Sequence, residues 1–209
     1  MGNKIVTKPL YLITGMCGSG KSTIANAMVK QYDLKELQSY TTRPKRSENE
    51  KGHTFVDMKT YNKKMRANLG IEKCDFTNPD KIVAVNQTNG QYYWADYRQV
   101  CEADIYVIDP KGIVDLAKNP AIWNRVRLVV VDAPWTLAME RMEKRGDKKS
   151  VRMERFYTWL EQQDKLAWAM KKLLADNKKY LIVKNYNNIL DDTFSFAESA
   201  AREIIEAEW

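Results

Sequence analysis

The sequence predicts an α/β protein of three layers, in which helices cover both faces of a parallel sheet. Short apolar runs rich in β-branched residues recur along the 209-residue chain. They alternate with longer segments of helical periodicity, which is the pattern of parallel strands joined by helices. The first run leads directly into a glycine-rich turn and then a helical segment. No apolar run approaches the ~20 residues that span a bilayer, so we expect a globular protein without a membrane partner.

The strands of the core are expected at four apolar runs: Leu10–Thr14, Ile105–Ile108, Leu128–Val131 and Tyr180–Val183. Arg152–Lys178 carries apolar residues at the period of one long helix. Residues 193–208 have the same period and predict a closing helix, for which Asp191 or Asp192 is the expected cap.

Two stretches interrupt this alternation. Residues 35–100 are polar, with a short helix expected at Met58–Ala67 and small strands at Ile82–Val85 and Gln91–Trp94, and residues 141–155 are dense in charge. We interpret the first as an inserted substrate-binding lobe and the second as a short mobile lid. The sequence thus predicts a single domain over 1–209, whose core comprises about 1–34, 101–140 and 156–209.

Basic residues outnumber acidic ones by 34 to 27, which gives a formal net charge of +7. This excess indicates an anionic partner such as a nucleotide, or only a lysine-rich solvated surface. Cys17, Cys74 and Cys101 form no CxxC pair, and Met1–Lys8 is too polar for a signal peptide. We therefore expect reduced thiols and a cytoplasmic protein. The single histidine argues against a histidine-bound metal.

A phosphate-binding loop is predicted between the first strand and the first helix. Residues 15–22, GMCGSGKS, match the pattern GxxxxGK[ST] in full. Backbone N–H groups of such a loop point at phosphate oxygens, its lysine reaches the terminal phosphates, and its serine binds Mg²⁺. The sequence therefore predicts a P-loop NTPase fold with ATP and Mg²⁺ as cofactors. The expected ATP ligands are Gly15, Gly18, Ser19, Gly20, Lys21, Ser22 and Thr23, of which Lys21 is also catalytic.

A carboxylate is expected to complete the metal site beside Ser22. Asp109 directly follows the apolar run Ile105–Ile108, where such a carboxylate lies in P-loop folds. A turn residue before Pro110 is the other interpretation of Asp109, and both remain open. Asp132 also ends a strand, but the Ala133-Pro134 that follows it is more typical of a turn.

A second phosphate site is predicted by the segment SYTTRPKR, residues 39–46. Arg43 and Arg46 lie three residues apart in a proline-stiffened turn, and each guanidinium can bind two phosphate oxygens at once. Taken alone, the segment is equally suited to a basic surface loop.

At this segment the chain resembles the guanylate kinases, which phosphorylate a nucleoside monophosphate. Four further stretches follow in the order of that family. NGQYYW (89–94) is similar to its Gly-x-Tyr-Tyr element, IDPKG (108–112) to its Asp-x-x-Gly element, ERMEKRGD (140–147) to its lid, and IVKNYNN (182–188) to a stretch near the adenine. The resemblance runs from about residue 8 to the C-terminus, and the P-loop and TTRPxR stretches are its most specific parts.

The resemblance implies roles for the matching residues and an ATP-dependent nucleoside monophosphate kinase activity. Arg43 and Arg46 would hold the acceptor phosphate, and Tyr93 would donate to it. Ser39 would lie near the acceptor, and His53 takes the place of a family tyrosine. The lid arginines Arg141 and Arg145 would close over the transferred phosphoryl group, joined by Arg152 or Arg155. Asn185 would lie near the adenine.

The chain departs from the family where guanine is read. Ala84 replaces a glutamate that accepts hydrogen bonds from guanine, Ala95 a hydroxyl residue, and Val107 an aspartate. Trp94 adds an indole that suits stacking on a base. The implied acceptor is therefore (d)GMP or a related nucleoside monophosphate whose base stays open.

Three alternatives accompany this hypothesis. One is a sugar-phosphate kinase on the same scaffold, similar to ribose bisphosphate phosphokinases. Another is a non-catalytic guanylate-kinase-like binding module, which the complete P-loop disfavours. The third, a kinase of nucleic-acid ends, rests only on the net charge and is also disfavoured.

Overall fold

The computed structural model describes residues 8–45, 48, 50, 52–71, 78–88, 90–186 and 193–209, and for residues 193 and 194 it describes the backbone alone. The predicted acceptor ligand Arg46, the thiol Cys74 and the caps Asp191 and Asp192 lie outside this part of the chain. Across the described residues, no helix has both the length and the apolar character that crossing a bilayer requires.

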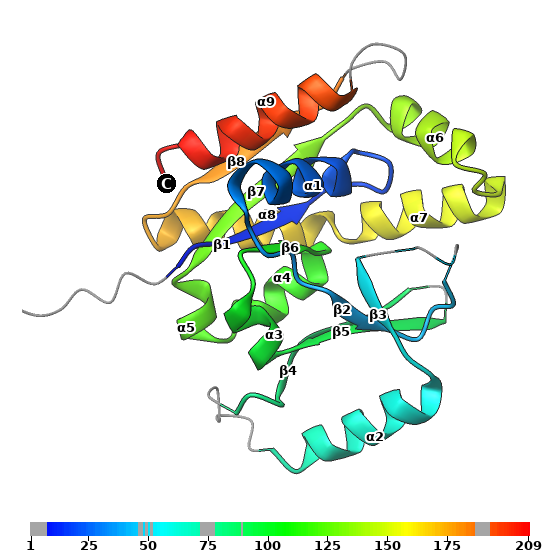
Figure 1. Cartoon of the computed structure of the whole chain (residues 1–209), viewed down its shortest axis with the longest axis vertical. Coiled ribbons are helices and arrows are strands. Elements are labelled where there is room, and N and C mark those ends of the chain that lie inside the picture. Colours follow the sequence, from blue (N-terminus) through cyan, green and yellow to red (C-terminus); the bar gives the residue numbers. More distant parts are fainter. Residues whose placement is uncertain are drawn as a thin grey trace, which may run out of the picture.

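A parallel sheet lies at the centre of the fold (Figure 1). Its described strands are β1 (Leu10–Thr14), β6 (Ile105–Val107), β7 (Val126–Asp132) and β8 (Tyr180–Lys184), in the order β6-β1-β7-β8. Every pairing between them is parallel. The four predicted strands are therefore confirmed, and their carboxyl ends meet at one edge of the sheet.

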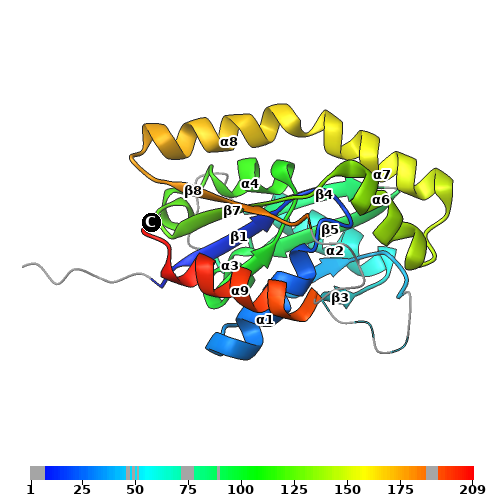
Figure 2. The same ribbon diagram turned by 90° about the horizontal axis from the view of Figure 1, so that it is seen from above.

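Side-chain alternation along the strands divides the core into two layers. Leu10 and Leu12 face one layer, and Tyr11 and Ile13 face the other. The first layer is covered by α4 (Pro110–Leu116), α5 (Pro120–Trp123) and α8 (Gln163–Ala175), and the second by α1 (Lys21–Tyr32) and α9 (Thr193–Glu206). Figure 2 shows α8 on one side of the strands and α1 with α9 on the other. Burial of both faces explains why the strands are apolar at successive positions.

The predicted single helix over Arg152–Lys178 is wrong, because two helices share that segment. α6 (Trp135–Lys144) packs on α7 (Lys149–Glu161), which ends before Gln162, and α8 begins at Gln163. The buried Gln162 side chain accepts a hydrogen bond from the Lys111 backbone N–H at 3.4 Å. Since the apolar period continues across this one-residue break, periodicity could not reveal it.

A second sheet is built from residues that the sequence assigned to the inserted lobe. It comprises β2 (Ser39–Thr41), β3 (His53–Phe55), β4 (Ile82–Thr88) and β5 (Gln91–Asp96), in the order β3-β2-β5-β4. β5 is antiparallel to both of its neighbours, and β2 pairs with β3 in parallel. The predicted helix is α2 (Met58–Leu69), and a short α3 (Tyr97–Glu102) follows β5.

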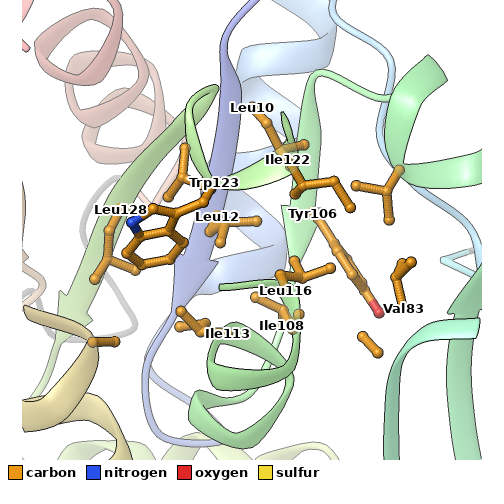
Figure 3. Close-up of a cluster of buried hydrophobic side chains, with 14 of the residues drawn as sticks. Leu10, Leu12, Val83, Tyr106, Ile108, Ile113, Leu116, Ile122, Trp123 and Leu128 are labelled. Carbon is orange, nitrogen blue, oxygen red and sulfur yellow. The ribbon is translucent and has the colours of Figure 1, made fainter. Parts of the chain in front are cut away.

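The apolar core of the first layer continues into this second sheet. Val83, Ala84 and Ala95 belong to the same buried cluster as Leu10, Leu12 and the α4 residues. Figure 3 shows the Tyr106 ring between the strands of the central sheet and Val83. The second sheet is therefore anchored to the central sheet through the edge that β4 forms.

The Trp94 side chain packs between the second sheet and α2, so it does not face a ligand. Its side chain is 2% exposed. The indole stacks on Tyr40 at a centroid distance of 5.2 Å and meets the edge of Tyr61 of α2 at 5.2 Å. The expectation that Trp94 stacks on a base is thus wrong, because strand alternation turns position 94 away from the face that carries Tyr93.

Removal of the Trp94 ring should destabilise the fold. We expect Trp94→Ala to lower the free energy of unfolding by about 3–5 kcal/mol, the usual effect of a large-to-small change at a buried aromatic residue. Trp168→Ala is the matched control, since Trp168 is 44% exposed. Urea denaturation of both variants measures the difference. Equal stability of the two variants would contradict the buried position of Trp94.

Candidate active site

The loop from β1 to α1 forms a tight cradle that only glycine allows. Gly18 and Gly20 have φ values of 83° and 101°. A Cβ at Gly18 would lie 2.4 Å from the Ala138 carbonyl oxygen, and one at Gly20 would lie 2.4 Å from Asn185 Nδ2. Gly20 caps α1 without a side-chain hydrogen bond. The first N–H groups of this helix are therefore available to an anion.

Lys21 folds back onto this loop. Its ammonium group donates to the carbonyl oxygens of Gly15 at 2.6 Å and Met16 at 2.7 Å. The pKa of Lys21 is lowered to about 8, mainly by burial. Arg145 also lowers it, and Cys17 and Asp109 act in the opposite direction. Arrival of phosphate oxygens would favour the charged form of this lysine.

Other predicted ATP ligands surround the lysine. The buried Ser19 hydroxyl has no hydrogen-bond partner in the described part of the chain. Ser22 and Thr23, in the first turn of α1, are exposed. An orphaned hydroxyl, an uncapped helix end and a glycine cradle together fit a polyphosphate.

Asp109 is the N-cap of α4. Its Oδ1 accepts from the Gly112 N–H at 2.8 Å, and its Oδ2 accepts from Asn86 Nδ2 at 2.6 Å. Burial raises the pKa of Asp109, although these two hydrogen bonds act to lower it. Asp109 therefore has the helix-capping position that the turn interpretation expects, and its bond to Asn86 joins the end of β6 to β4.

Asn185 connects the P-loop to the lid. Its Nδ2 donates to the Ser19 carbonyl at 2.8 Å, and its Oδ1 accepts from Arg141 Nη2 at 3.0 Å. Arg141 also donates to the Gly18 carbonyl at 3.2 Å. Both side chains therefore hold the loop in shape, a positioning role that the sequence did not predict for either.

The remaining lid arginines separate into two groups. Arg145 and Arg155 both donate to the Asp147 carboxylate, Arg155 at 2.8 Å, and both contact Cys17 Sγ at 3.6 Å. Arg152 instead pairs with Glu143 at 2.8 Å. Of the two candidates left open by the sequence, Arg155 is the one that faces the P-loop.

Cys17 lies among these cations. Burial raises the pKa of its thiol, but Lys21, Arg155 and Arg145 outweigh burial, and the pKa is lower than the ordinary value for cysteine. The Asp147 carboxylate thus supplies negative charge among these cations, and the cations favour the thiolate form of Cys17.

The second sheet presents the predicted acceptor residues on one face. Directly paired residues share a face, and the pairs Ser39–His53, Thr41–Tyr93, Asn86–Tyr93 and Thr88–Gln91 extend across all four strands. Ser39 Oγ lies 2.9 Å from His53 Nδ1. Ser39, His53 and Tyr93 are therefore brought together, as the sequence predicted.

Arg43 lies at the end of this face, where a carboxylate holds it. Its two terminal nitrogens donate to Glu50, at 2.7 and 3.2 Å, and its side chain is 12% exposed. The guanidinium also lies over the Phe55 ring; burial lowers its pKa, but Glu50 and Tyr93 outweigh burial and raise it. A paired fork of this kind has the geometry with which arginine binds phosphate.

Ala84 and Ala95 lie opposite each other at the other end of the same face. They are 3% and 0% exposed and belong to the buried core. Their methyl groups pack against the other residues of this core. Val107 lies alongside, in the wall of a small cavity of about 80 Å³ that Ala84 also lines.

One larger cavity of about 330 Å³ joins these parts. Gly15, Cys17 and Lys21 line it from the P-loop, Arg43 and Tyr93 from the second sheet, and Arg155 from α7. Thr158, Trp159 and Gln162 complete its wall. The sequence did not predict these last three as site residues, because the helical period assigns Trp159 to packing and gives no signal for its neighbours.

Comparison with known proteins gives the fold. The sequence matches no protein-family model and no curated protein. The structure is similar to a guanylate kinase from Anaplasma phagocytophilum, with a TM-score of 0.54, 14% identity, and coverage of 95% of this chain and 83% of that chain. The fold is that of a P-loop kinase. A shikimate kinase from Acinetobacter baumannii, in complex with shikimate, aligns with a TM-score of 0.41, 14% identity, and coverage of 95% and 92%.

Asp147→Asn should change how the site responds to ATP. The variant loses the charge between Arg145 and Arg155, so we expect the ligand-free protein to lose about 1–2 kcal/mol of stability. ATP should raise the melting temperature more than in the wild type, because its phosphates meet no competing carboxylate. Differential scanning fluorimetry over a range of ATP concentrations measures both effects.

Glu140→Gln is the control for this experiment, because Glu140 is an exposed residue of α6 that forms an ion pair with Lys144 at 3.0 Å and does not contact Asp147's pair of arginines in the described bonds. An ATP-induced shift in Asp147→Asn equal to that of the control would show that Asp147 does not stand in for phosphate.

Proposed function

We propose that this chain is an ATP-dependent phosphotransferase of the guanylate kinase type, which moves the γ-phosphate of ATP to a nucleoside monophosphate. The main support is that one cavity is lined by two separate phosphate-binding groups. Lys21 and the P-loop line it on one side, and Arg43 with Tyr93 lines it on the other. Phosphoryl transfer requires a donor and an acceptor phosphate to meet in line, and this arrangement provides for both.

The donor would bind in the glycine cradle. Backbone N–H groups of the loop and the end of α1 hold its phosphates, and Lys21 leaves the carbonyls of Gly15 and Met16 to reach the terminal oxygens. Mg²⁺, when bound, neutralises phosphate charge, and the exposed Ser22 hydroxyl is its ligand from this chain. Because Asp109 already accepts two hydrogen bonds, it acts in the proposed mechanism mainly by positioning α4 and β4.

Residues 141–155 would act as the lid and supply the charge that stabilises transfer. Arg145 and Arg155 exchange Asp147 for phosphate oxygens when ATP is present. Fixed cations at the transferred group stabilise the transition state without covalent chemistry. Closure of the lid excludes water and so disfavours simple ATP hydrolysis.

Residues 35–100 would hold the acceptor. Its phosphate displaces Glu50 from the Arg43 fork and receives a hydrogen bond from Tyr93. Ser39 and His53, bonded to each other, lie on the same face next to Tyr93. Arg46 stays a proposed ligand on the strength of the sequence alone.

A sugar-phosphate kinase is the second candidate, and the packing of Ala84 and Ala95 favours it. Both methyl groups are buried in the core, so these positions offer no hydrogen bond to guanine. An acceptor without a base would need none. Assay of ribose 1,5-bisphosphate beside nucleoside monophosphates separates the two candidates.

Lys21→Ala should lower the turnover number by at least ~100-fold, because a preorganised charge at the transferred phosphate is lost. A coupled assay of ADP release with ATP, Mg²⁺ and a panel of acceptors measures this. Lys165→Ala, an exposed change on α8, is the control and should be unaffected. Near-normal turnover of Lys21→Ala would reject the proposed donor site.

Arg43→Ala should raise the KM for the acceptor by at least about tenfold and leave the KM for ATP nearly unchanged, because the lost hydrogen bonds involve only the acceptor phosphate. Steady-state kinetics with each substrate varied in turn gives both constants. Lys45→Ala removes a neighbouring charge on an exposed side chain and serves as the control. An increase confined to the KM for ATP would place the acceptor elsewhere.

A further inference from the structure

Besides its P-loop residues and Arg43, the cavity of about 330 Å³ has a wall that neither proposed phosphate requires. Thr88 and Gln91 form one side of this wall, at the turn end of the β4–β5 hairpin, and Trp159 and Gln162 form the other side, where α7 meets α8. These four side chains are uncharged. A second phosphate in this position would call for lysine or arginine, so the wall fits a neutral group better.

The orientation of the Gln91 amide follows from its neighbour. Thr42 Oγ1 accepts a hydrogen bond from the Tyr92 N–H at 2.9 Å, so its own proton is free to donate to Gln91 Oε1 at 3.2 Å. The carbonyl end of Gln91 is thereby fixed at Thr42. Its amide Nε2 has no protein partner among the described residues and remains a donor for the cavity.

Gln162 is oriented in the same way. Its Oε1 accepts from the Lys111 backbone N–H at 3.4 Å, and an N–H can only donate. The Gln162 side chain is buried and lines the cavity, and within the described chain its Nε2 has no partner. A second amide donor therefore belongs to the same wall.

The Asn86 and Asp109 side chains beside these amides already hold hydrogen-bond partners. Asn86 Oδ1 accepts from the Gln87 N–H at 2.9 Å, and Asn86 Nδ2 donates to Asp109 at 2.6 Å. Asp109, the carboxylate of the described cavity lining, already accepts hydrogen bonds at both oxygens. A base with several adjacent N–H donors would have to share oxygens that already accept a hydrogen bond, whereas carbonyl oxygens would meet the two amide donors.

We propose that the acceptor carries a base with two carbonyl oxygens on either side of a single N–H, as in the pyrimidine-2,4-diones uracil and thymine, and that Gln91 and Gln162 donate to those two oxygens. Guanine, in contrast, presents N1–H and N2–H donors that would meet the donors of this wall. The half-buried Trp159 indole adds an apolar surface against which a flat ring can pack. This inference rests on the proposed function, since it concerns the acceptor of that reaction.

The first test is an acceptor panel for the wild-type protein. With ATP and Mg²⁺, we expect kcat/KM for the 5′-monophosphates of uridine and thymidine to exceed that for GMP and dGMP by at least about tenfold, the effect of leaving one buried donor unpaired. Equilibrium binding of the same nucleotides by calorimetry should give the same order. Preference for a guanine nucleotide or for ribose 1,5-bisphosphate would overturn the proposal.

The second test changes the donors of the wall into acceptors. Gln91→Glu and Gln162→Glu preserve shape, and each carboxylate can still accept from Thr42 or Lys111. We expect each to shift the ratio of dTMP to dGMP efficiency towards dGMP by about tenfold. Because both acceptors carry the same phosphate, the ratio cancels any effect of the new charge on Arg43.

Gln87→Glu is the matched control, since Gln87 is exposed on the opposite face of β4 and lies outside the cavity lining. A ratio in both wall variants equal to that of this control would overturn the assignment. If ATP transfers phosphate to no acceptor, the proposed function fails. The binding order of the nucleotides then still decides the inference, and equal or absent binding overturns it.

Discussion

Concentrated positive charge is the constraint that organises this site. Lys21, Arg43, Arg145 and Arg155 all line or adjoin one cavity, and without phosphate they would repel one another. The structure resolves this by placing carboxylates among them: Glu50 accepts from Arg43, and Asp147 accepts from Arg145 and Arg155. Lys21 meanwhile donates to backbone carbonyls. Each cation thus has a partner within the protein, and in the proposed function phosphate binding would exchange these partners more than it would rearrange the chain.

The acceptor side depends on a different constraint, the anchoring of the second sheet to the core. Ala84 and Ala95 lie inside the main apolar cluster at one end of the sheet, and Thr88 with Gln91 lies at the other end. One end of this face is thus part of the buried core. The polar groups that remain free are near the hairpin turn and the start of α8, where the backbone N–H of Lys111 and the hydroxyl of Thr42 orient the glutamines. In the proposed function the same face would serve both packing and acceptor binding, which would link changes in the two.

Much of the architecture follows from local sequence. A strand such as Leu10–Thr14 is buried on both faces, so its sequence is an uninterrupted apolar run. The ends of that run predicted the ends of the strand. The helical break at Gln162 spans a single residue and leaves the apolar period intact, so periodicity could not predict it. Trp94 was misjudged because its neighbours in the sequence are site residues, whereas alternation sends its ring to α2. For Trp94, the direction of the side chain and not its residue type decided whether it packs in the core or faces the cavity.

The sequence by itself determined the two segments that we propose to bind phosphate. The P-loop is contiguous, its glycines and Lys21 act through their own backbone geometry, and the TTRPxR segment carries its arginine in one turn, so local pattern was sufficient. Only the tertiary structure decided which lid arginine faces the P-loop, that Asp109 and Asn185 bind the protein's own groups, and that Gln162 from α7–α8 shares a cavity with Gln91 from β5. Those relations join residues far apart in the chain, and they depend on which hydrogen-bond partners packing brings within reach.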